Sequence, residues 1–348
     1  MGRKGVAQMV VALALLGGCA KKSAPAAVAA EASKKYLPPG AEAYFEIHLP
    51  DLLGASAFRE QVAILRGGLP AECLALFDVT KELSVAAYGS FDDLLALLPS
   101  FAKPKEGEEA AEAPAPAAPT APDIAWLMVG PTKEQVLGCV KAMSHGTLAT
   151  KEETRNGQTV TLLTTPLGEL GLVSPEETTQ AVAAAVRLDA LLAAIGGGPT
   201  IDGTPLLAGL SAVPSGSVMA VANVPDWLAE MIGKGLKMLG GEREIPPPTM
   251  VALSVSLGSD ISLAGAITMA DEESARILEG VANAGVSMVR MMVKGLGDGD
   301  PGLKSLGSVV DSISVSRSGT SVGGRVRVTS EALDFLMSAG RPRGPGRP

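Results

Sequence analysis

Pairs of short apolar segments joined by tight turns are the feature that most limits how this chain can fold. Three such pairs occur, at residues 147–154 with 158–165, 250–257 with 261–269, and 312–316 with 321–329. The first pair encloses Asn156-Gly157, a dipeptide typical of two-residue hairpin turns. Within the pairs, apolar and polar residues alternate, as expected for strands with one buried face. The sequence therefore predicts antiparallel hairpins as the basic sheet unit.

Amphipathic segments with capping residues predict helices that pack on these hairpins. Thr132 with Gln135, and Ser174 with Glu177, have the spacing of a capping box. Asp271 precedes the longest predicted helix, at 272–295. On that helix the apolar residues recur on one side, at 275, 278, 281, 282, 289 and 292, opposite a charged side. This pattern indicates an amphipathic helix and not a transmembrane one.

Two stretches of the chain resemble each other. A Pro-x-Gly turn at 38–40 precedes a predicted strand and then Pro50-Asp51, and a similar turn at 214–216 precedes a strand and then Pro225-Asp226. We therefore expect an α+β fold of two similar modules, residues 37–200 and 201–339, each an antiparallel sheet packed with amphipathic helices. The alternative is one mixed domain in which the same turn chemistry recurs.

The first nineteen residues have the pattern of a secretory signal. Arg3 and Lys4 precede an apolar stretch from Val6 to Leu16, which is too short to span a bilayer about 30 Å thick. The stretch ends in Leu-Gly-Gly followed by Cys19, which resembles the lipobox of bacterial lipoproteins. The resemblance implies a signal peptide at 1–18 cleaved after Gly18, acylation (palmitate included) of Cys19, and, because Ala20 follows, an outer-membrane location facing the periplasm. The alternative is an ordinary secretory signal in which the cysteine falls by chance.

Three segments lack the apolar residues that a core needs. Residues 19–36 are predicted to form a flexible tether, 103–122 a disordered Pro/Ala/Glu insertion, and 340–348 a disordered tail of Arg, Pro and Gly. The insertion contains no apolar side chain larger than alanine, so burial cannot offset the entropy lost on ordering it.

Composition excludes several classes of function. The net charge of −8 opposes binding to nucleic acid, which requires clustered Lys and Arg, and 3% aromatic residues leave few rings for stacking on bases. Only two histidines occur in 348 residues, so His-based metal sites and many acid–base mechanisms are not expected. We expect no cofactor, no metal and no catalytic residue.

One polar cluster has two interpretations. Glu46 and His48 lie two residues apart on a predicted strand, with Asp51 close behind, so the three side chains could hold a metal through oxygen and nitrogen. The alternative, a polar strand end without a ligand, is favoured because a fourth ligand is missing.

Two further groups leave alternatives open. Cys73 and Cys139 remain after Cys19 is acylated, and the sequence fits either a disulfide in an oxidising compartment or two buried thiols. Five methionines fall on two predicted helices, at 231, 238, 288, 291 and 292. Methionine suits both adaptable binding surfaces and core packing.

The body of the chain resembles uncharacterised bacterial envelope lipoproteins that open with a Leu-Pro-x-Gly turn and a strand, here at 37–40. We therefore expect a non-enzymatic, lipid-anchored envelope protein that contacts the membrane through its N-terminal lipid and has a partner-binding or structural role. The alternative is a periplasm-facing carrier of a lipid or another apolar ligand. A third hypothesis is an enzyme that uses Glu46, His48 and Asp51.

Overall fold

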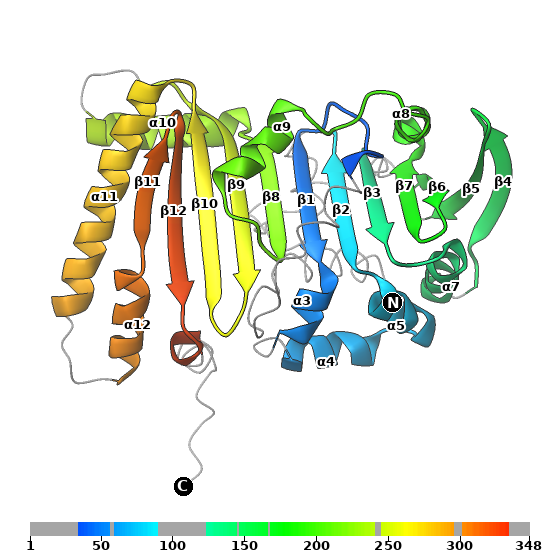
Figure 1. Ribbon diagram of the computed structural model, residues 1–348, viewed down its shortest axis with the longest axis horizontal. Coiled ribbons are helices and arrows are strands. Elements are labelled where there is room, and N and C mark those ends of the chain that lie inside the picture. Colours follow the sequence, from blue (N-terminus) through cyan, green and yellow to red (C-terminus); the bar gives the residue numbers. More distant parts are fainter. Residues whose placement is uncertain are drawn as a thin grey trace, which may run out of the picture. The chain divides into compact units, whose positions relative to one another are not determined.

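The computed structural model describes residues 34–55, 59–89, 123–144, 146–165, 168–240, 245–295 and 301–333. Within these ranges the chain forms two compact units. Unit 1 holds residues 34–50 and 61–207, and unit 2 holds residues 51–60 and 208–333. Both units combine helices with antiparallel strands (Figure 1), which confirms the predicted α+β class. The likeness of the two units as copies of one module stays a prediction.

The sheet of unit 1 has the strand order β1-β2-β3-β7-β6-β5-β4, with every neighbouring pair antiparallel. Its strands are β1 (Ala43–His48), β2 (Glu82–Ala87), β3 (Ile124–Val129), β4 (Ala149–Arg155), β5 (Gln158–Thr165), β6 (Gly168–Glu176) and β7 (Thr179–Ala184). The predicted Asn-Gly hairpin joins β4 to β5. Asn156 and Gly157 have φ angles of 50° and 77°, the left-handed values that this turn needs.

Helices cover both faces of this sheet. The segment before β2 contains α3 (Leu49–Gly54), α4 (Arg59–Gly68) and α5 (Ala71–Val79), of which residues 51–54 and 59–60 belong to unit 2. Helices α7 (Lys133–Met143) and α8 (Ala185–Ile195) follow later in unit 1. Val136 of α7 packs on Leu163 and Leu172. Leu188 of α8 packs on Val160, whose side chain points to the opposite face from that of Leu163. Apolar layers on both sides explain why β7 is buried along its whole length.

The helix predicted to start at Ser174 is wrong. Residues 168–184 form the hairpin β6–β7, in which Val173 pairs with Ala181 and Glu176 with Thr179. Pro175 lies where the register shifts, a position in a strand that tolerates a residue without an N–H. The Ser174 hydroxyl donates to the side chain of Gln180 at 2.6 Å instead of capping a helix. Burial of β7 on both faces therefore outweighs the local capping signal.

The other two capping predictions are confirmed. At the start of α7, the Thr132 hydroxyl accepts a hydrogen bond from the Gln135 N–H, and the Gln135 side chain accepts one from the Thr132 N–H. At the start of the long helix, the Ser274 N–H donates to Asp271 Oδ1 at 2.7 Å. Each cap satisfies backbone donors that the first helical turn leaves unpaired.

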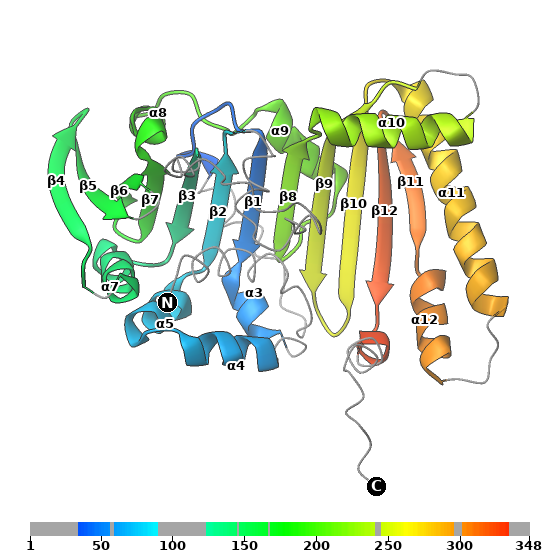
Figure 2. The ribbon, with the colours of Figure 1, turned by 180° about the vertical axis from the view of Figure 1, so that it is seen from behind.

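The sheet of unit 2 has the order β11-β12-β10-β9-β8, again with antiparallel neighbours. Along the chain, unit 1 passes into unit 2 within α9 (Pro205–Ala208). The elements that follow in unit 2 are η2 (Gly209–Ala212), β8 (Val218–Asn223), α10 (Asp226–Gly240), β9 (Pro248–Leu257), β10 (Ile261–Met269), α11 (Glu272–Gly295), α12 (Pro301–Asp311), β11 (Ser314–Ser318) and β12 (Ser321–Val328). Figure 2 shows α10 lying across one end of this sheet, with α11 beside β11. Across the described ranges, no helix combines the length and apolarity needed to cross a membrane.

Candidate functional site

An apolar hollow on one face of the unit 2 sheet is the strongest candidate for a binding site. It encloses about 500 Å³, and its twelve lining residues are all Gly, Ala, Val, Leu or Ile. The floor comes from β9, β10 and β12, whereas Leu278 and Ala282 of α11 and Val315 of β11 form a wall. We call this hollow the sheet groove. Its size falls within the range of small-molecule pockets, which is about 300–1,000 Å³.

The sheet groove exists because two adjacent strands lack side chains at its floor. Leu253 of β9 pairs with Gly265 of β10, which pairs with Gly324 of β12, which pairs with Val315 of β11. These four residues form one row across the same face, so two glycines separate two large apolar side chains. A Cβ atom at Gly324 would meet only the carbonyl oxygen of Ser314, 4.0 Å away. The space above Gly324 is therefore unfilled, whereas the Leu253 side chain reaches over Gly265, where an added Cβ would lie 3.2 Å from Leu253 Cδ2.

One end of the groove is packed and the other is open. On the packed side, Met269, Ala275 and Val322 form a core cluster with Ile232 of α10. On the open side, Leu253 is 58% exposed and Leu263 is 40% exposed. Monomeric soluble proteins seldom expose adjoining large apolar residues of this kind unless the surface binds something. The groove thus has an apolar opening as well as an apolar floor.

The methionines predicted from sequence lie mainly on the surface of unit 2. Met231 of α10 and three methionines of α11, at 288, 291 and 292, are between 55% and 68% exposed. The core-packing alternative is therefore wrong for these four. The side chain of Met238 lies outside the described residues. Val289 and Met292, predicted on the packed face of α11, are 42% and 64% exposed, so the prediction of packing is wrong for these two residues.

A buried polar cluster occupies the β1–β2 region of unit 1. The Tyr44 hydroxyl donates to Glu46 Oε2 at 2.8 Å and lies 3.0 Å from Ser84 Oγ, which donates to Glu82 Oε1 at 3.1 Å. His48 Nε2 lies 3.3 Å from Glu46 Oε1. The pairing of β1 with β2 places all five side chains on one face of the sheet. Four of the five residues are at most 1% exposed, and His48 is the exception.

The charge of Glu46 is stabilised inside the protein. Burial acts to raise the pKa of this carboxyl, but the hydrogen bonds from His48 and Tyr44 and the charge of Lys34, 3.4 Å away, together hold the pKa below its ordinary value. Burial and the nearby Glu46 charge raise the pKa of Tyr44 well above its ordinary value. Tyr44 therefore stays protonated and serves as a donor.

The polar cluster is not arranged as a metal site in the part of the chain that the structure describes. Among the residues the structure describes, no group of three His, Cys, Asp or Glu side chains is placed to hold a metal. Glu46 and His48 are thus brought together as predicted, but Asp51 does not complete a site with them. Its side chains instead form hydrogen bonds with one another on two neighbouring strands. Buried polar networks of this kind fix the register of a core.

A second hollow, in unit 1, is polar. It encloses about 540 Å³, with Lys133, Gln158 and Ser174 in its lining. Lys133 forms a 2.6 Å ion pair with Glu152, and Ser174 is bonded to Gln180. Since Lys133 and Ser174 already have partners in the protein, this hollow is a weaker candidate than the sheet groove.

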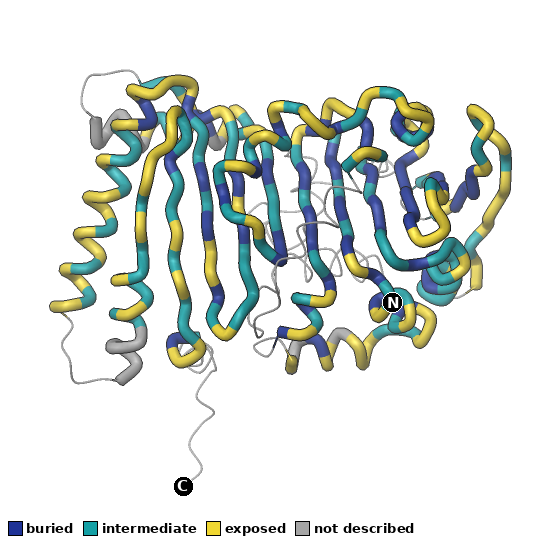
Figure 3. Tube along the Cα trace, viewed as in Figure 1, coloured by how far each residue is buried: buried dark blue, intermediate teal, exposed yellow. Residues whose placement is uncertain are grey.

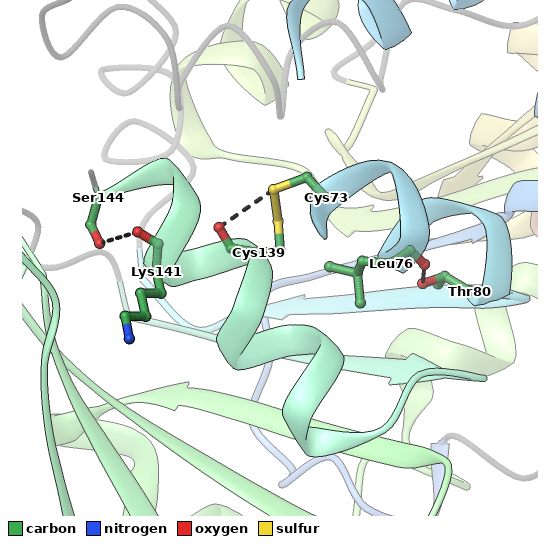
Figure 4. The surroundings of a disulfide bond; sticks show 6 residues. All are labelled: Cys73, Leu76, Thr80, Cys139, Lys141 and Ser144. Carbon is green, nitrogen blue, oxygen red and sulfur yellow. Dashed lines mark hydrogen bonds between the residues drawn. A yellow bond between two sulfur atoms is a disulfide. The ribbon is translucent and has the colours of Figure 1, made fainter. Parts of the chain in front are cut away.

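The two cysteines that the sequence left open are joined in the structure. Cys73 of α5 and Cys139 of α7 form a disulfide with an S–S distance of 2.06 Å (Figure 4). Both residues are buried. The bridge links the two helices that pack together beside the unit 1 sheet. The lipidation residue Cys19 and the cleavage residue Gly18 lie outside the described residues.

The solved structures that resemble this chain do so distantly. No family model matches the sequence, and no curated protein matches it. Among solved structures, crystal form III of TP0453 aligns with a TM-score of 0.44 at 10% identity, covering 88% of this chain and 98% of that one. Crystal form I of TP0453 aligns with a TM-score of 0.42 at 9% identity, covering 88% and 96%. At these values the likeness carries no argument about function.

Sequence reasoning missed the sheet groove. The pairing of Gly265 with Gly324 depends on strand order, which the hairpin patterns alone do not give. A signal was nevertheless present, because glycine inside a predicted strand often marks the close approach of another group. Gly265, Gly323 and Gly324 all fall inside segments that were predicted as strands.

Proposed function

We propose that this protein is a non-enzymatic, lipid-anchored protein of the bacterial envelope whose sheet groove binds the hydrocarbon part of a lipid or a similar apolar ligand. The observation that carries the proposal is the lining of the groove, which offers no hydrogen-bonding side chain among its described residues. A ligand with buried polar groups would lose its hydrogen bonds to water there without replacement. A hydrocarbon chain loses none.

The anchor part of the proposal rests on the sequence. The signal-like N-terminus and the lipobox ending in Cys19 support acylation of that cysteine, and Ala20 supports sorting to the outer membrane. Replacing Cys19→Ser should abolish incorporation of labelled palmitate. Continued labelling of the Cys19→Ser variant would contradict this part of the proposal.

The groove part has a direct test. Native mass spectrometry of the Cys19→Ser chain, purified without detergent, should detect a bound mass of several hundred daltons that is released on denaturation. The fluorescent probe N-phenyl-1-naphthylamine should bind the emptied protein with a rise in emission. A clean mass together with no probe binding would overturn the groove proposal, while leaving the anchor proposal untouched.

A matched pair of variants assigns the binding to the groove. Gly324→Leu adds a side chain at the floor, where space is open, and should weaken probe binding at least about tenfold. Ser316→Leu adds the same side chain on the neighbouring strand, facing away from the groove, and should leave binding unchanged. Equal loss in both variants would place the binding elsewhere.

The proposal also includes the internal repeat. Two features support copies of one module at 37–200 and 201–339. In each, a Pro-x-Gly turn leads into a strand, β1 or β8, and the helix α3 or α10 follows. Independent folding of residues 201–339, measured by cooperative thermal unfolding, is expected from this proposal, and an unfolded fragment would count against it.

A further inference from the structure

Helix α11 has two apolar faces, and only one of them packs within the described part of unit 2. The helix has 24 residues and is therefore about 36 Å long. On the packed face Ala275 is fully buried, and Leu278 and Ala282 line the sheet groove. On the other face Met288 and Met291 are 55% and 68% exposed. Figure 3 shows the second half of the helix as a run of exposed and intermediate residues.

The outward face of α11 has the spacing of a helix–helix seam. Its residues are the half-buried Ile277 and Val281 and the exposed Ala284, Met288 and Met291, which follow one another at intervals of four, three, four and three. This is the heptad repeat of positions a and d that faces a partner helix in a coiled coil. The packed face of the same helix does not need this repeat, because Ala275 and Ala282 lie on the opposite side.

The charges of α11 are segregated along its length. Three glutamates, at 272, 273 and 279, lie in the first eight residues with one arginine, Arg276, whereas Arg290 and Lys294 lie in the last six. Glu273 and Lys294 both flank the outward seam at the heptad position called g. In an antiparallel pair of identical helices, position g of one copy lies beside position g of the other, and such flanking charges set the partner and the orientation.

We propose that the outward face of α11 binds the same face of a second copy of this chain, in an antiparallel pair related by a two-fold axis near Ala284. In that arrangement Glu273 of each copy lies beside Lys294 of the other, since both are about ten residues from the axis. A parallel pair would instead bring the two acidic ends together and the two basic ends together. Self-complementarity of one surface is what a two-fold interface requires.

The first test measures mass in solution. Multi-angle light scattering of the Cys19→Ser chain at about 100 μM should give twice the mass of one chain, falling toward the single mass on dilution. Changing Met288→Glu and Met291→Glu together should give the single mass at all concentrations, because the new carboxylates would be buried against apolar seam residues of the other copy, among them Ile277. Both side chains are exposed, and an unchanged far-ultraviolet dichroism spectrum would show that the fold is intact.

A charge-swap series tests the antiparallel direction. Glu273→Lys alone, or Lys294→Glu alone, places like charges together and should weaken dimerisation about fivefold. The variant carrying both changes restores opposite charges only in an antiparallel pair and should recover most of the affinity. Within one chain Glu273 also pairs with Arg276 at 2.6 Å, so the dichroism spectrum of each variant serves as a control for helix content.

Cross-linking gives an independent test of register. Ala284→Cys should form a disulfide-linked dimer under mild oxidation, because the two copies of residue 284 lie near the axis. Met291→Cys is the matched control, because two copies of residue 291 would lie about 14 helical positions apart, about 21 Å, and should not cross-link.

A chain that stays monomeric at about 100 μM, or cross-linking of Met291→Cys in place of Ala284→Cys, would overturn the proposal. Binding of the monomer to phosphatidylglycerol vesicles, lost in Met288→Glu, would overturn it too and assign the face to a membrane surface instead.

Discussion

The Tyr44 hydroxyl donates a 2.8 Å hydrogen bond to Glu46, two residues further along the same strand. The buried hydroxyl thereby stabilises the negative charge of a buried carboxylate. Both residues are only 1% exposed. A buried carboxylate is costly unless several groups compensate it, and here His48, Lys34 and Tyr44 do so together. Protonation of Glu46 would therefore remove a favourable set of contacts.

Stability should fall in acid because of Glu46. The folded-state pKa of this carboxyl lies below its ordinary value of 4.5, so its ionisation stabilises the protein at neutral pH. That contribution decreases as the pH falls below 4.5 and is lost below the folded-state pKa. Glu46→Gln should cost about 1–3 kcal/mol at pH 7 and should flatten the dependence of unfolding free energy on pH between about 5 and 3. Urea unfolding across this range measures both effects, and an unchanged slope would exclude Glu46 as the source.

Removing the disulfide should destabilise unit 1. Cys73 and Cys139 are 66 residues apart, and closing a loop of that length in the unfolded chain corresponds to about 4 kcal/mol in the chain-entropy account. The variant with Cys73→Ser and Cys139→Ser should therefore unfold at lower urea concentration than the oxidised protein. The doubly substituted protein should also be insensitive to dithiothreitol. If the reductant has no effect on the unsubstituted protein, the bond contributes nothing.

Helix α8 should depend on a glycine beneath it. A Cβ atom added at Gly171 would lie 2.5 Å from Leu188 Cδ1, and Leu188 is fully buried and has little room to move. Gly171→Ala should cost about 1–3 kcal/mol by overpacking. The control is Gly138→Ala in the middle of α7, where the nearest atom would be 3.9 Å away. That change should stabilise by up to about 1 kcal/mol because alanine favours the helix. Similar effects of the two changes on thermal unfolding would argue against this packing.

The elements that sequence predicted well are those with local signals. The Asn156-Gly157 turn and the caps at Thr132 and Asp271 are determined by residues close together in the chain, and all three occur as expected. The helix expected at Ser174 failed for the converse reason. Residues 179–184 pair with β3 as well as with β6, and that non-local pairing outweighs a local capping pattern.

The sheet groove could not be predicted from the sequence for a related reason. A groove floor made by Gly265 and Gly324 requires knowing that β10 and β12 are neighbours, although 59 residues separate the two glycines. The sequence places several methionines on the predicted helix α11, but the spacing of apolar residues alone does not show which of its two apolar faces packs on the protein. In the structure α11 contacts β11 and β12, and Met288 and Met291 are exposed. Only this placement of the helix shows that their face does not pack on the sheet.

Arg187 of α8 binds residues on both sides of the segment that contains the predicted insertion. Its guanidinium donates to the carboxylate of Asp123, with Nε at 2.9 Å, and lies 4.2 Å from the centre of the Tyr88 ring. The Tyr88 N–H also donates to the Asp123 carbonyl at 2.9 Å. Tyr88 and Asp123 are therefore held side by side by contacts that do not involve residues 103–122, which lie outside the described residues.

Deleting residues 103–122 should accordingly change stability little. Residues 90–102 would still join Gly89 to Asp123, and they are long enough to connect two points that already lie side by side. Shortening a long connection lowers the entropy cost of closing it only slightly, so the unfolding free energy should change by less than about 1 kcal/mol, in the stabilising direction. Urea unfolding of the shortened chain beside the full chain measures this difference.

Arg187→Ala is the contrasting change, because it removes the contacts that hold Tyr88 and Asp123 together. It should cost about 1–2 kcal/mol in the full chain through loss of the paired hydrogen bonds and of the contact with the ring. In the chain without residues 103–122 the cost should be the same, since the contacts of Arg187 do not depend on the insertion. Chemical unfolding of the two single variants and the combined one forms a complete cycle. A deletion that costs as much as Arg187→Ala would show that the insertion contributes to the folded structure and would refute its prediction as a disordered segment.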